Sequence, residues 1–172
     1  MQIELDQKLG FKDVLIKPKR STLQSRSEVS LNREFKFRNS GKSWSGIPIM
    51  SANMDTIGTF SMAKALHSIG MFTVVHKHYP LDQWHDFISS NEPSILNSIS
   101  ICTGISEMDS QRAEEILSSY PKLQFMCIDV ANGYTEKFIN FVRFTREKYP
   151  DTTIIAGNVV TADMTQELIL SG

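Results

Sequence analysis

The sequence predicts a parallel α/β fold, a (β/α)8 or TIM barrel, of which the chain supplies about five of the eight βα units. Five short apolar runs alternate with five segments of helical periodicity, and the centres of the runs lie about 25–28 residues apart. Polar residues follow each run, at the edge where the carboxyl ends of parallel strands meet. The even spacing and these polar clusters favour a closed barrel over an open doubly wound sheet.

Each predicted strand is a short apolar run that suits a strand buried on both faces. The runs are residues 47–51, 72–75, 99–102, 125–128 and 153–156. Between and after them, apolar side chains recur at steps of three and four, which predicts helices at residues 60–69, 81–88, 109–120, 135–149 and 163–170. We expect Asp55 to cap the first helix and Gly70 to end it. Asp109 or Ser110 is expected to cap the third helix, and Thr135 the fourth.

The chain divides by pattern into two parts. Residues 1–46 read as an N-terminal arm with short strands, including a short strand or turn at residues 11–16 and a half-exposed strand at residues 34–38. Residues 47–172 read as the N-terminal part of the barrel. Because a barrel needs eight strands and typically about 250 residues, we expect truncation before the sixth strand and a longer parent protein.

The composition is that of an ordinary globular protein, with 41% hydrophobic residues, 22% charged residues and a net charge of −1. The apolar runs are shorter than the ~18 residues of a membrane-spanning helix, and the N-terminus is polar. We therefore expect a cytoplasmic protein in which Cys102 and Cys127 are buried free thiols. We predict no metal site, no membrane association and no nucleic-acid partner, and the locally basic segment 12–38 reads as solvated surface.

Polar side chains gather where the predicted strands end, as in the active sites of barrels. They are Ser51, Asn53, Asp55, His76, Lys77, His78, Thr103, Asp129, Asn132 and Asn158. Lys77 can move protons or form a Schiff base, and the alternatives are a solvated side chain or an ion pair with Asp129. Asp129 ends a buried strand before a turn, where ligand-binding groups lie, and its alternative is a helix cap. We expect at most one of His76 and His78 to point at a ligand.

The sequence resembles the IMP dehydrogenase/GMP reductase family over essentially its whole length. The matching stretches are KLGFKDVLIKPKRSTLQSRSEV, GIPIMSANMDTIGTFSMA, VVHKHY, CIDVANGYTEKF and AGNVVTADMTQELILSG. Of these, DVANGY and HKHY look like the reductase branch. The resemblance implies a (β/α)8 barrel that works as a homotetramer in purine nucleotide salvage. The implied reaction is the NADPH-dependent reductive deamination of GMP to IMP with release of ammonia.

The resemblance also implies which residues act. Cofactor binding would involve Ser25, Arg26, Lys77, Asp129, Val130, Ala131 and Asn158. Asp129 would bind the ribose on the nicotinamide side, because a carboxylate can accept from two hydroxyls. Asn158 would lie near the nicotinamide, and Lys77 would be the catalytic residue that assists proton transfer. Ser25 and Arg26 would reach the cofactor of a neighbouring subunit, since a guanidinium suits a phosphate.

Other parts of the family's machinery have no counterpart in these 172 residues. The family's catalytic cysteine, its potassium ligands and an acid/base threonine lie on the loop after the sixth strand, and its phosphate-binding loops come later. Neither Cys102 nor Cys127 matches the cysteine motif. We therefore expect the chain alone to be inactive and the potassium site to belong to the missing half.

Three other functions are compatible with parts of the pattern. IMP dehydrogenase is one, although it usually carries a regulatory domain between the second helix and the third strand, where residues 79–99 leave no room for it. A Schiff-base aldolase using Lys77 is another. The third is a non-catalytic nucleotide-binding or assembly fragment, which would bind NADPH without turning it over.

Overall fold

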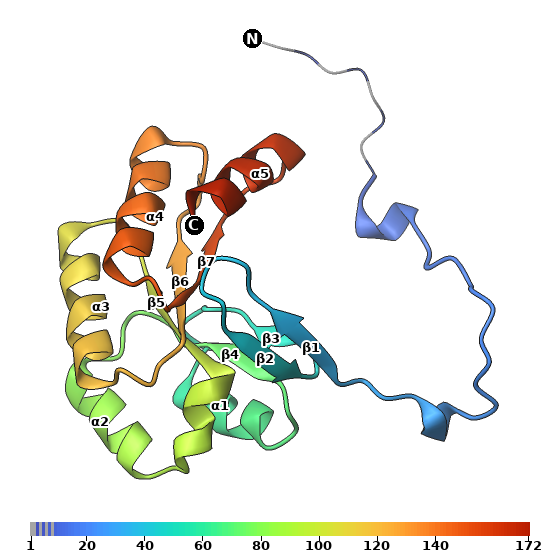
Figure 1. Cartoon of the computed structure of the whole chain (residues 1–172), viewed down its shortest axis with the longest axis horizontal. Coiled ribbons are helices and arrows are strands. Elements are labelled where there is room, and N and C mark those ends of the chain that lie inside the picture. The colour runs from blue at the N-terminus through green and yellow to red at the C-terminus, as the bar shows by residue number, and fades with distance from the viewer. Residues whose placement is uncertain (1–2, 4, 6, 8) are drawn as a thin grey trace. The chain divides into compact units, whose positions relative to one another are not determined.

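The computed structural model describes residues 3, 5, 7 and 9–172. The chain separates into two compact units, Met1–Ser30 and Leu31–Gly172 (Figure 1). In the first unit, 3₁₀ helices span Phe11–Asp13 and Arg26–Glu28. The strand or turn expected at residues 11–16 is therefore a short helical turn followed by extended chain. The domain boundary at residue 46 stays a prediction.

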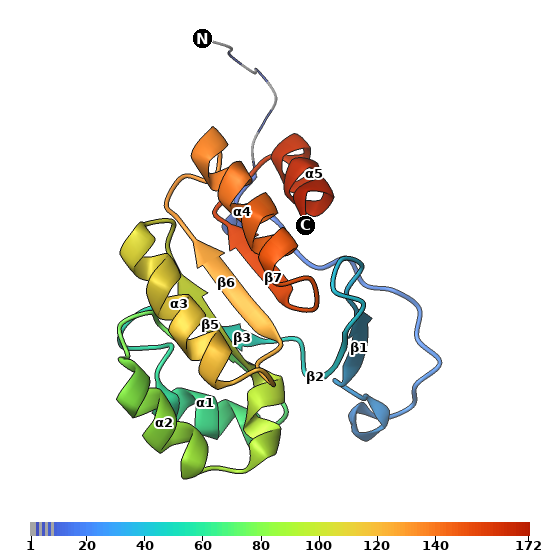
Figure 2. The ribbon, with the colours of Figure 1, turned by 60° about the vertical axis from the view of Figure 1, so that its left-hand side comes forward.

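A five-stranded parallel sheet forms the centre of the second unit, and it curls into half of a barrel (Figure 2). Its strands are β3 (Met50–Ser51), β4 (Phe72–Val74), β5 (Ile99–Thr103), β6 (Phe125–Asp129) and β7 (Thr153–Gly157), in this spatial order. The pairing brings Cys102 opposite Cys127 and Asp129 opposite Gly157. The prediction of about five βα units of a TIM barrel is confirmed, and all five carboxyl ends share one edge.

The first predicted strand is much shorter than its apolar run. Only Met50 and Ser51 pair as a strand with β4, whereas residues 47–49 were expected to pair as well. The backbone N–H of Ile47 donates to Gly70, just before β4, at 2.8 Å, and the backbone oxygen of Ile49 accepts from Phe72, the first residue of β4, at 3.0 Å. Pro48 lies between them and has no N–H to donate, so a regular ladder cannot extend across it.

Five helices cover the outer face of the sheet (Figure 2). They are α1 (Phe60–His67), α2 (Leu81–Ser89), α3 (Glu107–Ser119), α4 (Glu136–Lys148) and α5 (Ala162–Ser171). Thr135 caps α4 as predicted, by accepting from the backbone N–H of Phe138 at 3.3 Å. The other predicted N-caps are wrong, because Thr59 rather than Asp55 caps α1, and Ser106 rather than Asp109 or Ser110 caps α3. Gly70, predicted to end the first helix, follows the C-cap residue Ser68 by two positions and has a φ of 73°. Within the described residues, no helix combines the length and apolar character needed to cross a bilayer.

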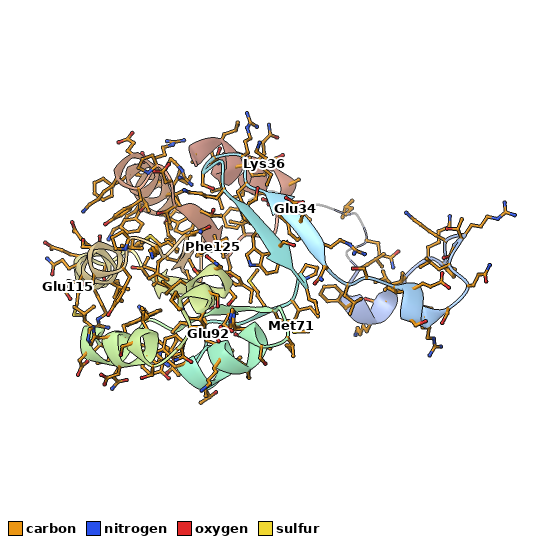
Figure 3. The ribbon with its side chains drawn as sticks, turned by 60° about the horizontal axis from the view of Figure 1, so that its bottom comes forward. Glu34, Lys36, Met71, Glu92, Glu115 and Phe125 are labelled. Atoms are coloured by element: carbon orange, nitrogen blue, oxygen red, sulfur yellow. The ribbon has the colours of Figure 1, made fainter. Side chains whose placement is uncertain are left out.

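The two faces of the sheet bury different side chains. Outward-facing residues such as Ile101 and Met126 pack with the helices. Inward-facing residues form a second cluster of Phe72, Val74, Cys102, Phe125 and Cys127. Figure 3 shows Phe125 in the interior and Glu115 on the outer side of α3. The alternation places Cys127 and Asp129, two residues apart on β6, on the inward face.

An antiparallel hairpin of β1 (Arg33–Lys36) and β2 (Ser43–Gly46) packs against this inward cluster. Trp44 lies edge-on to Phe72 at 5.8 Å between ring centroids, and Phe37 lies edge-on to Phe125 at 5.6 Å. The sequence predicts β1 but not β2, because SWSG has only one apolar residue and no alternation to read.

Candidate functional site

The loops and strand ends along the carboxyl edge of the sheet enclose a cleft of about 530 Å³. Its lining comes from the segments that follow β3 and β4 and from the ends of β5 and β6. The lining residues are Asn53, Met54, Asp55, Thr56, Lys77, His78, Cys102 and Asp129. Five of these eight are polar strand-end residues that the sequence singles out, so the fold gathers side chains that lie far apart in the chain.

Asn53, in the segment after β3, contacts residues of β5 and β6 in the lining of this cleft. Its Nδ2 donates to Oδ2 of Asp129 at 2.8 Å and to Sγ of Cys102 at 3.1 Å. The carboxylate of Asp129 therefore has one oxygen held by a neutral amide rather than by a cation. Because none of the ion pairs among the described residues involves Asp129, its carboxylate stays available to hydroxyl donors of a ligand.

Lys77 forms an ion pair with Asp109 of α3, at 3.1 Å between Nζ and Oδ2. The side chain of Lys77 is 38% exposed and that of Asp109 only 14%. Oδ2 of Asp109 also accepts from Oγ of Ser106 at 2.7 Å. Burial opposes ionisation of Asp109, but the hydrogen bonds from Ser106 and Lys77 outweigh it and lower the pKa of Asp109. The ion pair with Asp129 considered above is not formed; Asp109 holds the lysine instead.

One residue in the sequence, Gly104, relates to the ion pair of Asp109 with Lys77, although the helical periodicity does not indicate this pair. Gly104 follows β5, and a Cβ at this position would lie 2.4 Å from Oδ2 of Asp109 and 3.3 Å from Nζ of Lys77. A side chain at this position would therefore displace the carboxylate of Asp109 from its place in the ion pair. Arg112 of α3 adds a second link by donating to the backbone oxygen of Lys77 at 3.0 Å.

The two histidines next to Lys77 have different environments. Residues two apart on a strand would share a face, but His76 and His78 lie beyond the end of β4 at Val74. His76 is 7% exposed and stacks on Tyr79, with 4.1 Å between ring centroids. Burial, together with the nearby His78, lowers the pKa of His76, and Asp55 only partly offsets this. His78 lines the cleft and contacts Oδ1 of Asp55 at 3.2 Å. Asp55 therefore faces the cleft and not the first turn of α1.

The loops after β6 and β7 form a separate cluster beside the cleft. Val130 donates to Gly157 and Asn158 donates back to Val130, both at 2.8 Å along the backbone. Gly133 donates to the backbone oxygen of Asn158 at 2.9 Å. Ala131 and Asn158 are exposed, and neither they nor Val130 line the cleft of Lys77 and Asp129. The predicted cofactor residues thus fall into two neighbouring groups, joined through the Asp129–Val130 peptide.

The remaining predicted residues are placed as follows. Ser25 and Arg26 are exposed in the unit Met1–Ser30, where Ser25 accepts from the N–H of Ser27 at 3.2 Å. Thr103 is buried and donates to the backbone oxygen of Gly104 at 3.0 Å. Asn132 is exposed and accepts from the N–H of Tyr134 at 3.0 Å. Among the described residues, Oγ of Ser51 is buried without a hydrogen-bond partner.

Comparison with known proteins decides the family. The sequence model of the IMP dehydrogenase / GMP reductase domain matches residues 8–172. The chain belongs to this family. It is 58% identical over 172 residues to a GMP reductase of Klebsiella pneumoniae and 57% identical to one of Escherichia coli. The alignments cover 100% of this chain and 50% of each relative, so the chain spans about half the length of the curated relatives it matches.

A solved member of the family shares the fold. The crystal structure of inosine 5′-monophosphate dehydrogenase from Legionella pneumophila matches 96% of this chain and 49% of its own, with a TM-score of 0.80 at 27% identity. Family members adopt a TIM barrel, and the curled sheet of this chain is half of one. The family membership and the fold class that the motifs implied are therefore confirmed.

Proposed function

We propose that the protein to which this chain belongs is a GMP reductase, which converts GMP to IMP with NADPH and releases ammonia. The observation that carries this proposal is the cleft that Lys77 and Asp129 share. It lies at the carboxyl edge of a parallel sheet, where barrel enzymes hold their substrates. The 58% identity to a GMP reductase over the whole chain favours this reaction over others on the same fold.

The donor and acceptor groups of the cleft fit the nicotinamide riboside part of NADPH. Asp129 offers a carboxylate to ribose hydroxyls while Asn53 holds one of its oxygens in place. Asn158, Val130 and Ala131, on the adjoining loops, complete the proposed cofactor contacts, and the side-chain amide of Asn158 suits a carboxamide. When bound, NADPH would supply the hydride that replaces the amino group of GMP.

Lys77 is the residue that we assign to proton transfer. Replacement of the amino group by hydride requires a proton on the departing nitrogen, and an ammonium at the cleft wall can donate one. The ion pair between Nζ of Lys77 and Oδ2 of Asp109, at 3.1 Å, restricts the conformations of the lysine side chain. Nζ is therefore positioned before a ligand binds. Asp109 is therefore a positioning residue, and Lys77 is the catalytic one.

Residues outside the cleft complete the proposal. Ser25 and Arg26 would bind a cofactor phosphate of a neighbouring subunit, because Arg26 supplies the planar fork of donors that phosphates favour. This role requires a homotetramer or another closed assembly. Potassium would bind within the half of the relatives that this chain does not cover. We place the enzyme in the cytoplasm and in purine nucleotide salvage.

The 172-residue chain alone should not reduce GMP. In our assignment neither Cys102 nor Cys127 attacks the purine, so the nucleophile has to come from a segment outside this chain. The test is to purify the 172-residue polypeptide and follow NADPH oxidation with GMP. Turnover above a blank without protein would contradict this expectation.

The alternative is IMP dehydrogenase. One structural feature speaks against it, since α2 and β5 are connected only by residues 90–92 and the 3₁₀ helix Pro93–Ser98. We therefore propose to assay the full-length protein in both directions. GMP-dependent NADPH oxidation with formation of IMP and ammonia supports the reductase, and NAD-dependent oxidation of IMP supports the dehydrogenase. Binding of NADPH without either reaction would support a non-catalytic role.

A further inference from the structure

Two cysteines that the proposed function does not use lie side by side on the inward face of the sheet. Cys102 of β5 is directly opposite Cys127 of β6 in the parallel register. Both belong to the inward cluster, with exposed fractions of 9% and 8%. Neighbouring strands lie about 4.8 Å apart, which falls inside the range of Cα separations that a disulfide spans. The spacing and register of the two strands therefore meet the Cα condition for a disulfide.

The surroundings make the two thiols unequal. Sγ of Cys102 accepts a hydrogen bond from Nδ2 of Asn53 at 3.1 Å, and Cys102 lines the cleft, which gives small molecules access to it. A hydrogen bond from Cys127 lowers the pKa of Cys102 although burial opposes this, and Asn53 adds to the effect. The same thiol pair raises the pKa of Cys127, and burial raises it further. Of the two thiols, Cys102 is therefore the easier to deprotonate.

We propose that Cys102 and Cys127 are a peroxide-sensitive dithiol, which oxidises to a reversible disulfide across β5 and β6. The Cys102 thiolate attacks one oxygen of a hydroperoxide, the O–O bond breaks, and Cys102 becomes a sulfenic acid while the leaving oxygen takes up a proton. The thiol of Cys127 then attacks the sulfenic sulfur, and its proton leaves with the hydroxyl group as water. With hydrogen peroxide, two thiols lose two electrons and the peroxide is reduced to two waters.

This pair meets the conditions of a redox site rather than of a structural disulfide. Redox-sensing cysteines combine a favoured thiolate, access to solvent and a resolving cysteine nearby. Cys102 has the lowered pKa and lines the cleft, although it is only 9% exposed, and Cys127 lies in the position of the resolving residue. Disulfide formation would engage the Sγ of Cys102 that Asn53 now contacts, and Asn53 also holds Asp129. Oxidation would therefore alter the cleft through the side chain of Asn53. This effect does not depend on which reaction the cleft supports.

Peptide mapping of the full-length protein tests the proposal directly. Trypsin cleaves after Lys77, Arg112, Lys122 and Lys137, so Cys102 and Cys127 fall in separate peptides, residues 78–112 and 123–137. The reduced protein is treated with hydrogen peroxide, its remaining thiols are alkylated, and the digest is analysed by mass spectrometry. We expect a linked pair of these two peptides that disappears on treatment with dithiothreitol. Two alkylated or separately overoxidised peptides, without the linked pair, would overturn the proposal.

Two comparisons separate this reaction from chance oxidation. Peroxide treatment of the urea-unfolded protein should yield the linked pair at a much lower level, because the strand register is lost. Equal yields from folded and unfolded protein would show that the geometry plays no part. In Cys127→Ser, the sulfenic acid of Cys102 should persist and be trapped by dimedone, whereas Cys102→Ser should give no dimedone adduct at Cys127. Equal labelling of the two variants would contradict the assigned roles.

Discussion

The side-chain amide of Asn53 donates a 2.8 Å hydrogen bond to Asp129, which lies 76 positions later in the chain. This contact joins the segment after β3 to the end of β6 across two intervening strands, so it forms only when the sheet curls. It holds the carboxylate that we assign to the cofactor ribose. Four predictions test this and other contacts of the site.

Replacing Asn53 by alanine should weaken NADPH binding by about tenfold, because the carboxylate of Asp129 loses the donor that orients it. Binding is measured by fluorescence titration of the full-length protein with NADPH. The matched control is Asn97→Ala, since Asn97 is exposed and lies outside the cleft. Equal affinities of both variants and the wild type would rule out a role for Asn53 in binding.

Replacing Lys77 by methionine should lower kcat by about 10²–10⁴-fold, because a similar volume is kept while the proton donor is lost. Asp109→Asn should have a smaller effect of about tenfold, since it releases the ammonium without removing it. Steady-state kinetics with GMP and NADPH measure both. A Lys77→Met enzyme with wild-type kcat would refute the proton-transfer role. An Asp109→Asn enzyme that changes KM alone would refute the positioning role.

Acidification should destabilise the protein through His76. Burial lowers the pKa of His76 from its ordinary value of 6.5, so the folded state favours the neutral ring and the unfolded state binds the extra proton. Stability is therefore lost as the pH falls through 6.5. Thermal unfolding between about pH 7.5 and pH 5.5 should show a smaller decrease in Tm for His76→Gln than for the wild type. His85→Gln, at an exposed histidine, should keep the wild-type dependence.

Gly58→Ala should lower the free energy of unfolding by about 2–3 kcal/mol. A Cβ at Gly58 would lie 2.2 Å from the backbone oxygen of Val74 and 2.7 Å from that of Ala52, and neither backbone atom can move freely. Gly41→Ala is the comparison, because no atom lies within 4 Å of its added Cβ and only its φ of 67° is unfavourable. Urea denaturation should show a cost of about 1 kcal/mol there.

The backbone of the fold follows from local patterns, whereas the contacts of the site do not. Apolar runs and helical periods identify β4 to β7 and the five helices, because each pattern lies within one element. They miss β2, whose pairing with β1 depends on Trp44 packing on Phe72. They also extend β3 across Pro48. This residue fits the apolar run of a strand, but it has no N–H with which to pair.

The sequence predicts which residues lie at the site but not which of them contact each other. Strand ends identify Asn53, Lys77 and Asp129 because parallel strands share one carboxyl edge. The partner of Lys77 is Asp109, which lies on a helix and reads as a cap in the sequence. Which carboxylate a long side chain reaches depends on the curvature of the sheet and the position of α3, and neither has a local sequence pattern. The absence of a side chain at Gly104 is consistent with that pairing, because a Cβ there would lie 2.4 Å from Oδ2 of Asp109.

The interlocked loops after β6 and β7 have an energetic consequence. The hydroxyl of Tyr134 accepts from the N–H groups of Val160 and Thr161 at 2.9 and 3.0 Å, in addition to the Gly133–Asn158 contact. A ligand that binds against either loop therefore meets a surface assembled beforehand and loses less conformational entropy on binding. Substitutions in the two loops should accordingly be non-additive, so that an affinity measured after changing one loop depends on the state of the other.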